Sequence, residues 1–329
     1  MKNLTIYIDT LKKVSSKLSH FNFDKLDYDL DELQKAFDIA YDFGVFNLTS
    51  IEKDQIDLYK YELFKTLTLI SGNLSFLAIQ ILAANSIMKT RGFHKINHFL
   101  QKKCGIAINH LRVPKTIVWA EKVEGGFMLH GILSWASGYK IFDTLLIGFH
   151  CDNLEYEVMA DFKNQDGFSI GEAPKTFVGN GLNTVNIELN NFFVKDENIV
   201  ASRPLGNYTE AKAVSTTIHL CLYSLGNAVL LNTNDEEFKQ NASLKLDALK
   251  EIFLNTKDTK KMNHLRVELF ELVQSIITTA MTLYGGKCIL STTNLQRFYR
   301  EIIMFNVNGL NTDLKEISKT NFLISKGIK

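Results

Sequence analysis

Residues 125–150 read GGFMLHGILSWASGYKIFDTLLIGFH and decide how the middle of this 329-residue chain folds. Apolar side chains alternate on either side of a Trp-Ala-Ser-Gly turn, which is typical of two β-strands. Within the turn, Trp135 brings a large π-face, Ser137 a donor and acceptor, and Gly138 a backbone without a Cβ. On composition alone, such a turn is most simply a β-hairpin whose tryptophan fills a core. The same three residues are also suited to holding a flat heteroaromatic ring.

Proline and glycine divide the chain into three parts. All three prolines and eleven of the nineteen glycines lie between residues 105 and 206. Because both residue types are disfavoured inside helices, the two flanking parts are free to form long helices. The sequence therefore predicts a helical domain at residues 1–110, a β domain at 111–205 and a second helical domain at 206–329.

The spacing of apolar residues agrees with this division. In the first part, residues 30–43 and 51–70 repeat with the period of a helix. In the middle part, short apolar runs alternate with Gly, Asn and Asp turns, which predicts a compact β-barrel or sandwich. These runs are 116–123, 127–133, 144–150, 156–162 and 183–189. In the last part, four helical segments can bury their apolar stripes only against one another, which predicts a four-helix bundle. These segments are 209–231, 235–253, 262–284 and 295–306.

Composition excludes several classes of partner. With 37 basic against 36 acidic residues and no long basic tract, nucleic acid is not an expected partner. Residues 66–88 carry no charge, but polar residues interrupt them, so a buried helical hairpin or bent core helix is expected rather than a membrane span. Four widely spaced cysteines and no secretory signal predict a cytoplasmic protein. His94 and His98 have no acid or third histidine nearby, so no metal site is expected.

Three segments, in their order along the chain, resemble segments of the acyl-CoA dehydrogenase superfamily. Residues 125–149 resemble the middle-domain stretch in which an aromatic and a hydroxyl residue follow a strand. Residues 179–201, GNGLNTVNIELNNFFVKDENIVA, resemble the strand and exit segment of that domain. Residues 284–300, YGGKCILSTTNLQRFYR, are similar to its C-terminal Gly-Gly turn and the Gln-Arg pair that follows. The resemblance implies an α+β multidomain fold with an N-terminal helical domain, a middle β domain and a C-terminal four-helix bundle.

The same resemblance implies a flavin cofactor. This would be FAD, or reduced FMN or FAD taken up as a co-substrate. Trp135 would then lie beside the isoalloxazine ring, Ser137 would bond near its N5 atom, and Gly138 would complete the turn. The turn is thereby reinterpreted as an edge that faces a flavin.

A second group of residues would approach the dinucleotide part of an FAD bound mainly by a neighbouring subunit. These residues are Gly285, Gly286 and Gln296, and two adjacent glycines let backbone N–H groups reach a pyrophosphate. The resemblance therefore also implies a homodimer or homotetramer. Its substrate would be a small molecule, with acyl-CoA as the family default.

The position of the catalytic base departs from the family pattern. Many dehydrogenases carry a glutamate there, which removes the α-proton of the acyl thioester, and the monooxygenase branch carries a histidine. Counting from Arg300, this position falls on Asn308 or Gly309, and neither accepts a proton at neutral pH. Glu210 and His219 are the remaining substitutes, although a lone histidine on an apolar helix is usually a core residue.

Two flavin-binding motifs of the dehydrogenases are also missing from the sequence. The Thr-Glu-Pro stretch does not occur between Gly105 and Lys122, and the bundle lacks an Arg-x-x-Phe-Gly motif. We therefore expect an acyl-CoA dehydrogenase-like flavin-dependent oxidoreductase whose dehydrogenase activity is atypical or weak. The alternatives are a two-component reduced-flavin monooxygenase or N-hydroxylase, and a non-catalytic binding or assembly protein with the same fold.

Overall fold

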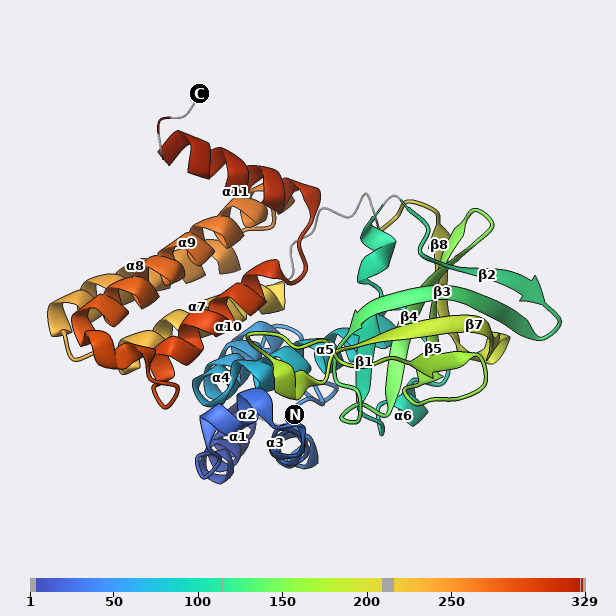
Figure 1. Cartoon of the computed structure of the whole chain (residues 1–329), viewed down its shortest axis with the longest axis horizontal. Helices are drawn as coiled ribbons and strands as arrows, with labels where there is room; N and C mark the ends of the chain where they lie inside the picture. The colour runs from blue at the N-terminus through green and yellow to red at the C-terminus, as the bar shows by residue number, and fades with distance from the viewer. Residues whose placement is uncertain (1–3, 114, 209–215, 326, 328–329) are drawn as a thin grey trace.

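The structure is a computed structural model that describes residues 4–113, 115–208, 216–325 and 327. Three parts follow one another: short N-terminal helices, a β-sheet, and a group of longer C-terminal helices (Figure 1). The N-terminal helices lie beneath the junction of the other two parts in this view and contact both of them.

The N-terminal part consists of helices. Its helices are α1 (Leu4–Leu18), α2 (Phe23–Tyr28), α3 (Leu30–Asp42), α4 (Ile56–Ile70), α5 (Gly72–Thr90) and α6 (Ile96–Phe99). Ser71 separates α4 from α5, because its Oγ accepts a hydrogen bond from the Asn73 N–H at 3.2 Å and so caps α5. The uncharged residues 66–88 therefore form two packed helices. Within the described ranges, no helix combines the length and apolarity needed to cross a membrane.

The middle part is one mixed sheet of eight strands. The strands are β1 (Cys104–Ala107), β2 (Val118–Val123), β3 (Gly126–Ala136), β4 (Thr144–Cys151), β5 (Leu154–Asp161), β6 (Phe168–Ile170), β7 (Val185–Lys195) and β8 (Ile199–Pro204). Their order is β6-β7-β3-β2-β4-β5-β8, and β1 pairs in parallel with β4. Every residue of β4 is buried, whereas β7 alternates between buried and exposed residues along most of its length. The core of this part therefore lies on one face of β7 and on both faces of β4.

The C-terminal part consists of helices that pack mainly along their lengths. They are α7 (Thr216–Leu231), α8 (Glu236–Leu254), α9 (Thr259–Tyr284), α10 (Asn294–Val307) and α11 (Thr312–Ser325). Asp235 and Asp258 begin α8 and α9, since each carboxylate accepts a hydrogen bond from the N–H three residues later. α7 is buried on nearly all sides, because it packs on α4, α8, α9 and α10.

The expected α+β arrangement of helical, β and helical parts is confirmed. The sequence does not predict β1, β6 and β8, which are short, and it does not predict α11 beyond the four bundle helices. β1 joins the sheet although it precedes residue 111. The division into domains at residues 1–110, 111–205 and 206–329 remains our proposal.

Candidate functional site

The end of β3 holds Trp135 in an unusual backbone conformation. The pairing of β3 with β7 shifts register between Leu133 and Ala136, which forms a β-bulge. Trp135 lies in this bulge with φ at 61°, and its N–H donates to Asn186 Oδ1 at 3.3 Å. A left-handed conformation costs a bulky residue about 1–3 kcal/mol and tends to occur at functional sites. The residue is 66% exposed, so the prediction from composition that it fills a core is wrong.

Hydrogen bonds and close packing hold the next residues of the turn in place. Ser137 is buried and its Oγ lies 2.9 Å from Thr184 Oγ1 at the start of β7. Gly138 has φ at 87° and its N–H donates to the Leu182 carbonyl at 2.7 Å. A Cβ at Gly138 would stand 2.3 Å from the Phe142 ring, so no larger residue fits. The turn therefore presents Trp135 on a rigid support.

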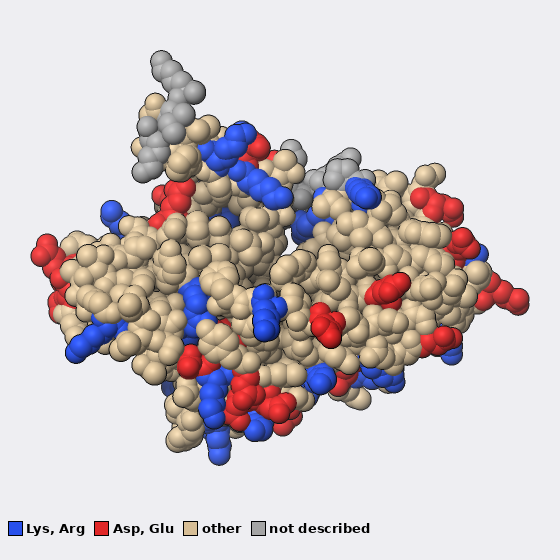
Figure 2. All heavy atoms as spheres, viewed as in Figure 1, with Lys and Arg blue, Asp and Glu red and all other residues tan. Residues whose placement is uncertain are grey.

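The C-terminal helices run alternately up and down, so four of their termini meet at one end. This end contains the start of α7, the end of α8, the start of α9 and the end of α10, and we call it the inner end of the bundle. Figure 1 shows it turned toward the sheet. Figure 2 shows that the surface is hollowed between the bundle and the sheet.

The family position of the catalytic base lies at this inner end. Asn308 caps the C-terminus of α10, and Gly309 follows with φ at 63°. The Asn308 Nδ2 atom is buried and has no hydrogen-bond partner within the described residues. An amide does not accept a proton at neutral pH, so the structure places no base at this position.

His219 lies at the same end, on the first turn of α7. It is fully buried, and its ring stacks on Phe253 of α8 with the ring centroids 3.5 Å apart. Burial and the nearby Arg266 guanidinium lower its pKa to about 3. The imidazole is therefore neutral at pH 7 and is a very weak base. Glu210, the other substitute, lies outside the described residues.

Arg266 is a residue of this site that the sequence analysis does not identify. Its Nη2 atom donates to the carbonyl oxygens of Phe305 and Asn306, each at 3.1 Å, and to that of Asn308 at 3.4 Å. The guanidinium thus satisfies the last carbonyls of α10, where the helix dipole favours a cation. A signal existed, because Arg266 continues the buried stripe of α9 through Leu269 and Val273.

Gly285, Gly286 and Gln296 lie at the opposite end of the bundle, beyond the end of α9. Because α9 has 26 residues, it separates them from the inner end by about 39 Å at 1.5 Å per residue. No heavy atom lies within 4 Å of where a Cβ would stand on either glycine. The Gln296 side chain already makes hydrogen bonds to its neighbours. Its Nε2 atom donates to the carbonyls of Ser291 and Thr293, and its Oε1 atom accepts from Arg300. One chain therefore does not bring these three residues next to Trp135.

Comparison of the whole structure with solved structures decides the fold. Butyryl-CoA dehydrogenase from Megasphaera elsdenii matches with a TM-score of 0.74 and 12% identity, over 98% of each chain. Nitrososynthase from Micromonospora carbonacea var. africana matches with a TM-score of 0.76 and 11% identity, over 100% of this chain and 97% of that one. The HsaA monooxygenase from M. tuberculosis matches with a TM-score of 0.71 and 12% identity, over 100% and 99%.

The chain has the acyl-CoA dehydrogenase fold. The resemblance found in the sequence is thereby confirmed at the level of the fold. No protein-family model and no curated protein sequence matches the chain.

Within this acyl-CoA dehydrogenase fold, the segment around Arg297 and Arg300 connects α10 to the N-terminal helices. Arg297 donates to Glu301 Oε1 at 3.0 Å, and the same oxygen accepts from the Gly72 N–H at 2.8 Å. Arg300 forms an ion pair with Asp27 of α2. The arginines that carry the sequence resemblance thus join the parts of the fold.

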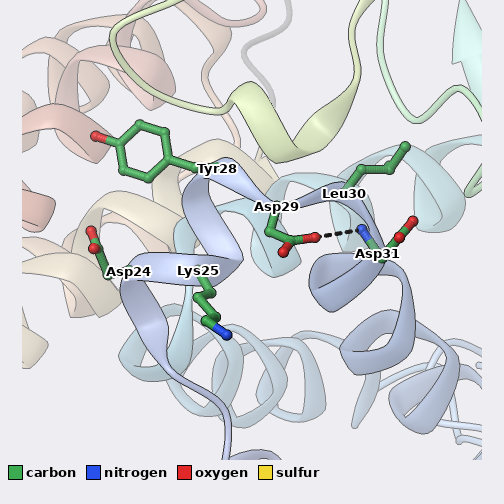
Figure 3. Close-up of a pocket in the computed structure, with 6 residues that line it drawn as sticks. All are labelled: Asp24, Lys25, Tyr28, Asp29, Leu30 and Asp31. Carbon is green, nitrogen blue, oxygen red and sulfur yellow. Dashed lines mark hydrogen bonds between the residues drawn. The ribbon is translucent and has the colours of Figure 1, made fainter.

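A large surface pocket lies in the N-terminal helices, and it is lined by neither Trp135 nor the residues of the inner end. It has a volume of about 470 Å³ and is formed by the end of α2 and the start of α3 (Figure 3). Three carboxylates line it against one amine, Lys25; they are those of Asp24, Asp29 and Asp31, and Asp29 Oδ1 is already used to cap α3. Such an acidic surface repels a pyrophosphate, so we place the candidate site between β3 and the inner end instead. The described residues contain no group of three or more His, Cys, Asp or Glu side chains that could hold a metal ion.

Proposed function

We propose that the chain is a flavin-dependent oxidoreductase that holds the flavin ring at the end of β3. The observation that carries the proposal is the exposed Trp135, held at a strained bulge at the end of β3. A ring of this kind offers a face for stacking, which is worth about 0.5–1.5 kcal/mol beyond burial. Among proteins with this fold, KijD3 has been solved with FMN and XiaF with FADH2.

The residues around Trp135 fit a flavin ring. Either hydroxyl can donate in the hydrogen bond between Ser137 and Thr184, and when Thr184 donates, the Ser137 proton remains for a ring atom. Gly138 places no side chain next to Ser137, and no Cβ fits at this position. When bound, a flavin supplies two-electron transfer and, in its reduced form, reaction with dioxygen.

We further propose that the oxidation follows the reduced-flavin monooxygenase or N-hydroxylase type. The side chain at the base position is the amide of Asn308, and the charged group beside it is the Arg266 guanidinium. A cation there stabilises an anion and does not remove a proton from an acyl thioester. His219 is neutral and buried against Phe253, so it helps to exclude water from this end. Dehydrogenation of an acyl-CoA is the less favoured reaction for the same reason.

We also propose that the protein is a homodimer or homotetramer with FAD as the bound form. Gly285 and Gly286 leave open space for a dinucleotide, yet they lie at the outer end of the bundle. A second copy would bring its own glycine turn to the flavin of the first. Exposed apolar side chains surround this turn, which suits a contact between copies; they are Leu283, Tyr284, Ile289 and Leu290.

Titration with flavin tests the binding of the cofactor. The chain has two tryptophans, and Trp119 on β2 is also exposed, so it provides a matched control. We expect Trp135→Ala to weaken the affinity for FAD and FMN by about tenfold, as lost stacking predicts, and Trp119→Ala to leave it unchanged. Flavin absorbance and fluorescence quenching measure both. No flavin binding by the parent protein would overturn the proposal.

Two assays then separate the reaction types. Supplied reduced flavin and dioxygen should be consumed with formation of an oxygenated product, and butyryl-CoA should not bleach bound FAD under anaerobic conditions. Bleaching by butyryl-CoA would instead establish a dehydrogenase. A non-catalytic binding or assembly protein is the second candidate, favoured by the use of Gln296 and Arg300 within the chain. Its signature would be the absence of stabilisation by either flavins or CoA esters in a thermal-shift screen.

A further inference from the structure

The inner end of the bundle contains several buried N–H donors that have no acceptor. They are Arg266 Nε and Nη1, Asn308 Nδ2 and the one ring nitrogen of the neutral His219 that carries a proton, and none of these atoms has a hydrogen-bond partner in the described residues. Buried polar groups are almost always hydrogen-bonded, because a buried donor without an acceptor destabilises the fold. Several such donors gathered at one place can receive an acceptor that the described residues do not supply.

Arg266 differs from the other buried arginine of the chain. Arg297 is equally buried, but it pairs with Glu301 at 3.0 Å. Arg266 has no carboxylate within 4.0 Å among the described residues, and its protein partners are three backbone carbonyls at the end of α10. A buried charge without a counter-charge is strongly unfavourable.

The surroundings of Arg266 leave its charge in place. Burial lowers its pKa only to about 10, so the guanidinium stays protonated at neutral pH. The neighbouring Cys221 thiol does not neutralise it, because burial raises the pKa of that thiol well above its usual range. Since Nη2 is fixed on the α10 carbonyls, Nε and Nη1 are the donors left for a ligand.

We infer that Arg266, Asn308 and His219 form a recognition site for a carboxylate of the substrate. Arg266 supplies the counter-charge, Asn308 an amide donor and His219 a ring N–H. The ring of Phe253 lies against His219, so the carboxylate would be carried on an apolar or aromatic body. The assignment to a substrate rests on the proposed function, whereas binding of the anion itself does not.

The test uses benzoate, with benzamide as its neutral counterpart, on the full chain without flavin. We expect benzoate to bind in calorimetry and to raise the unfolding temperature, and benzamide to do neither. Equal binding of benzamide, or no binding of benzoate, would overturn the inference. Stabilisation by chloride or phosphate without benzoate would also overturn it, because the donors would then hold a structural inorganic ion.

Two variants locate the site. Asn308→Asp supplies a carboxylate from the chain itself, so we expect it to weaken benzoate binding at least tenfold without loss of folding stability. Gln274→Glu adds the same charge on the exposed face of α9 and should leave benzoate binding unchanged. Arg266→Gln should also abolish binding, and Asn308→Asp keeps the test decisive if that variant does not fold. Benzoate binding that survives in Asn308→Asp would contradict the inference.

Parallel titration with FMN separates this site from the proposed function. Benzoate binding in a protein that binds no flavin would refute the oxidoreductase and leave the carboxylate site standing. Flavin binding without benzoate binding would refute the carboxylate site and leave the proposed flavin-dependent function standing.

Discussion

The backbone N–H of Gly72 donates to Glu301 Oε1 at 2.8 Å, which joins the first turn of α5 to the middle of α10. The same oxygen accepts from Arg297, so one carboxylate satisfies two donors that lie 225 residues apart. Burial raises the pKa of the Glu301 carboxyl, and the guanidinium and the N–H oppose that effect. This contact holds the C-terminal bundle on the N-terminal helices, and with it the inner end of the bundle.

Removing the carboxylate should destabilise the fold strongly. Glu301→Ala leaves Arg297 buried without a counter-charge, and we expect a loss of about 3–5 kcal/mol in the free energy of unfolding. Glu301→Gln keeps an acceptor and should lose less. Urea denaturation measures both. Glu316→Ala, which breaks an exposed pair with Lys319, is the control and should change stability by less than about 0.5 kcal/mol.

Gly72 should tolerate no side chain. A Cβ at this residue would stand 2.6 Å from Glu301 Cδ, so Gly72→Ala forces the carboxylate from its place and should cost about 1–3 kcal/mol. Gly286→Ala is the matched substitution, because no heavy atom lies within 4 Å of its Cβ position. Thermal unfolding should separate the two variants clearly. Equal midpoints would show that α10 can shift away from α5 without loss.

His219 should make stability depend on pH. Its pKa falls from 6.5 to about 3 on folding, so between these values the unfolded chain binds more protons than the folded one. The free energy of unfolding therefore rises with pH across this window, by up to about 1.4 kcal/mol per unit for this group. His219→Phe should remove this slope and retain the stack on Phe253.

The matched control for this prediction is His264→Gln, which changes an exposed histidine of α9. His110 adds a slope of its own, because burial lowers its pKa to about 4. The informative quantity is therefore the difference between each variant and the parent in urea unfolding from pH 4 to 7. An unchanged slope in His219→Phe would show that water reaches the imidazole.

The strained backbone at Trp135 should lower the stability of the fold, whereas its indole ring should strengthen flavin binding. Trp135→Gly removes the strain of the left-handed backbone, so it should be more stable than Trp135→Ala by about 1 kcal/mol. Both variants should lose affinity for flavin to the same extent, because both lack the indole ring. Thermal unfolding and flavin titration of the pair test this. Equal stability would mean that the bulge relaxes once the ring is gone.

The sequence predicts the order of the three parts because proline and glycine are confined to the middle one. It does not predict β1, which has four residues and no alternation, and which becomes a strand only by pairing with residues 144–147 of β4. β6, with three residues, gives no periodic signal at all. Short strands of this kind depend on distant partners rather than on local pattern.

The candidate site is only partly readable from the sequence. The order of three motifs points to Trp135, although its exposure depends on a bulge that no local pattern marks. Arg266 is harder, because an arginine on an amphipathic helix normally extends to solvent. Its burial depends on carbonyls at the end of α10, about forty residues later in the chain.

The distance between Trp135 and the Gly285–Gly286 turn has a genetic consequence in the proposed homodimer. Each flavin would be enclosed by the tryptophan of one chain and the glycine turn of the other. At a flavin concentration near the parental Kd, Trp135→Ala and Gly286→Glu chains would each leave every site largely empty when present alone. Mixed in one population, the two defective chains would complement one another, since each hybrid dimer regains one intact site, about a quarter of the parental activity in all.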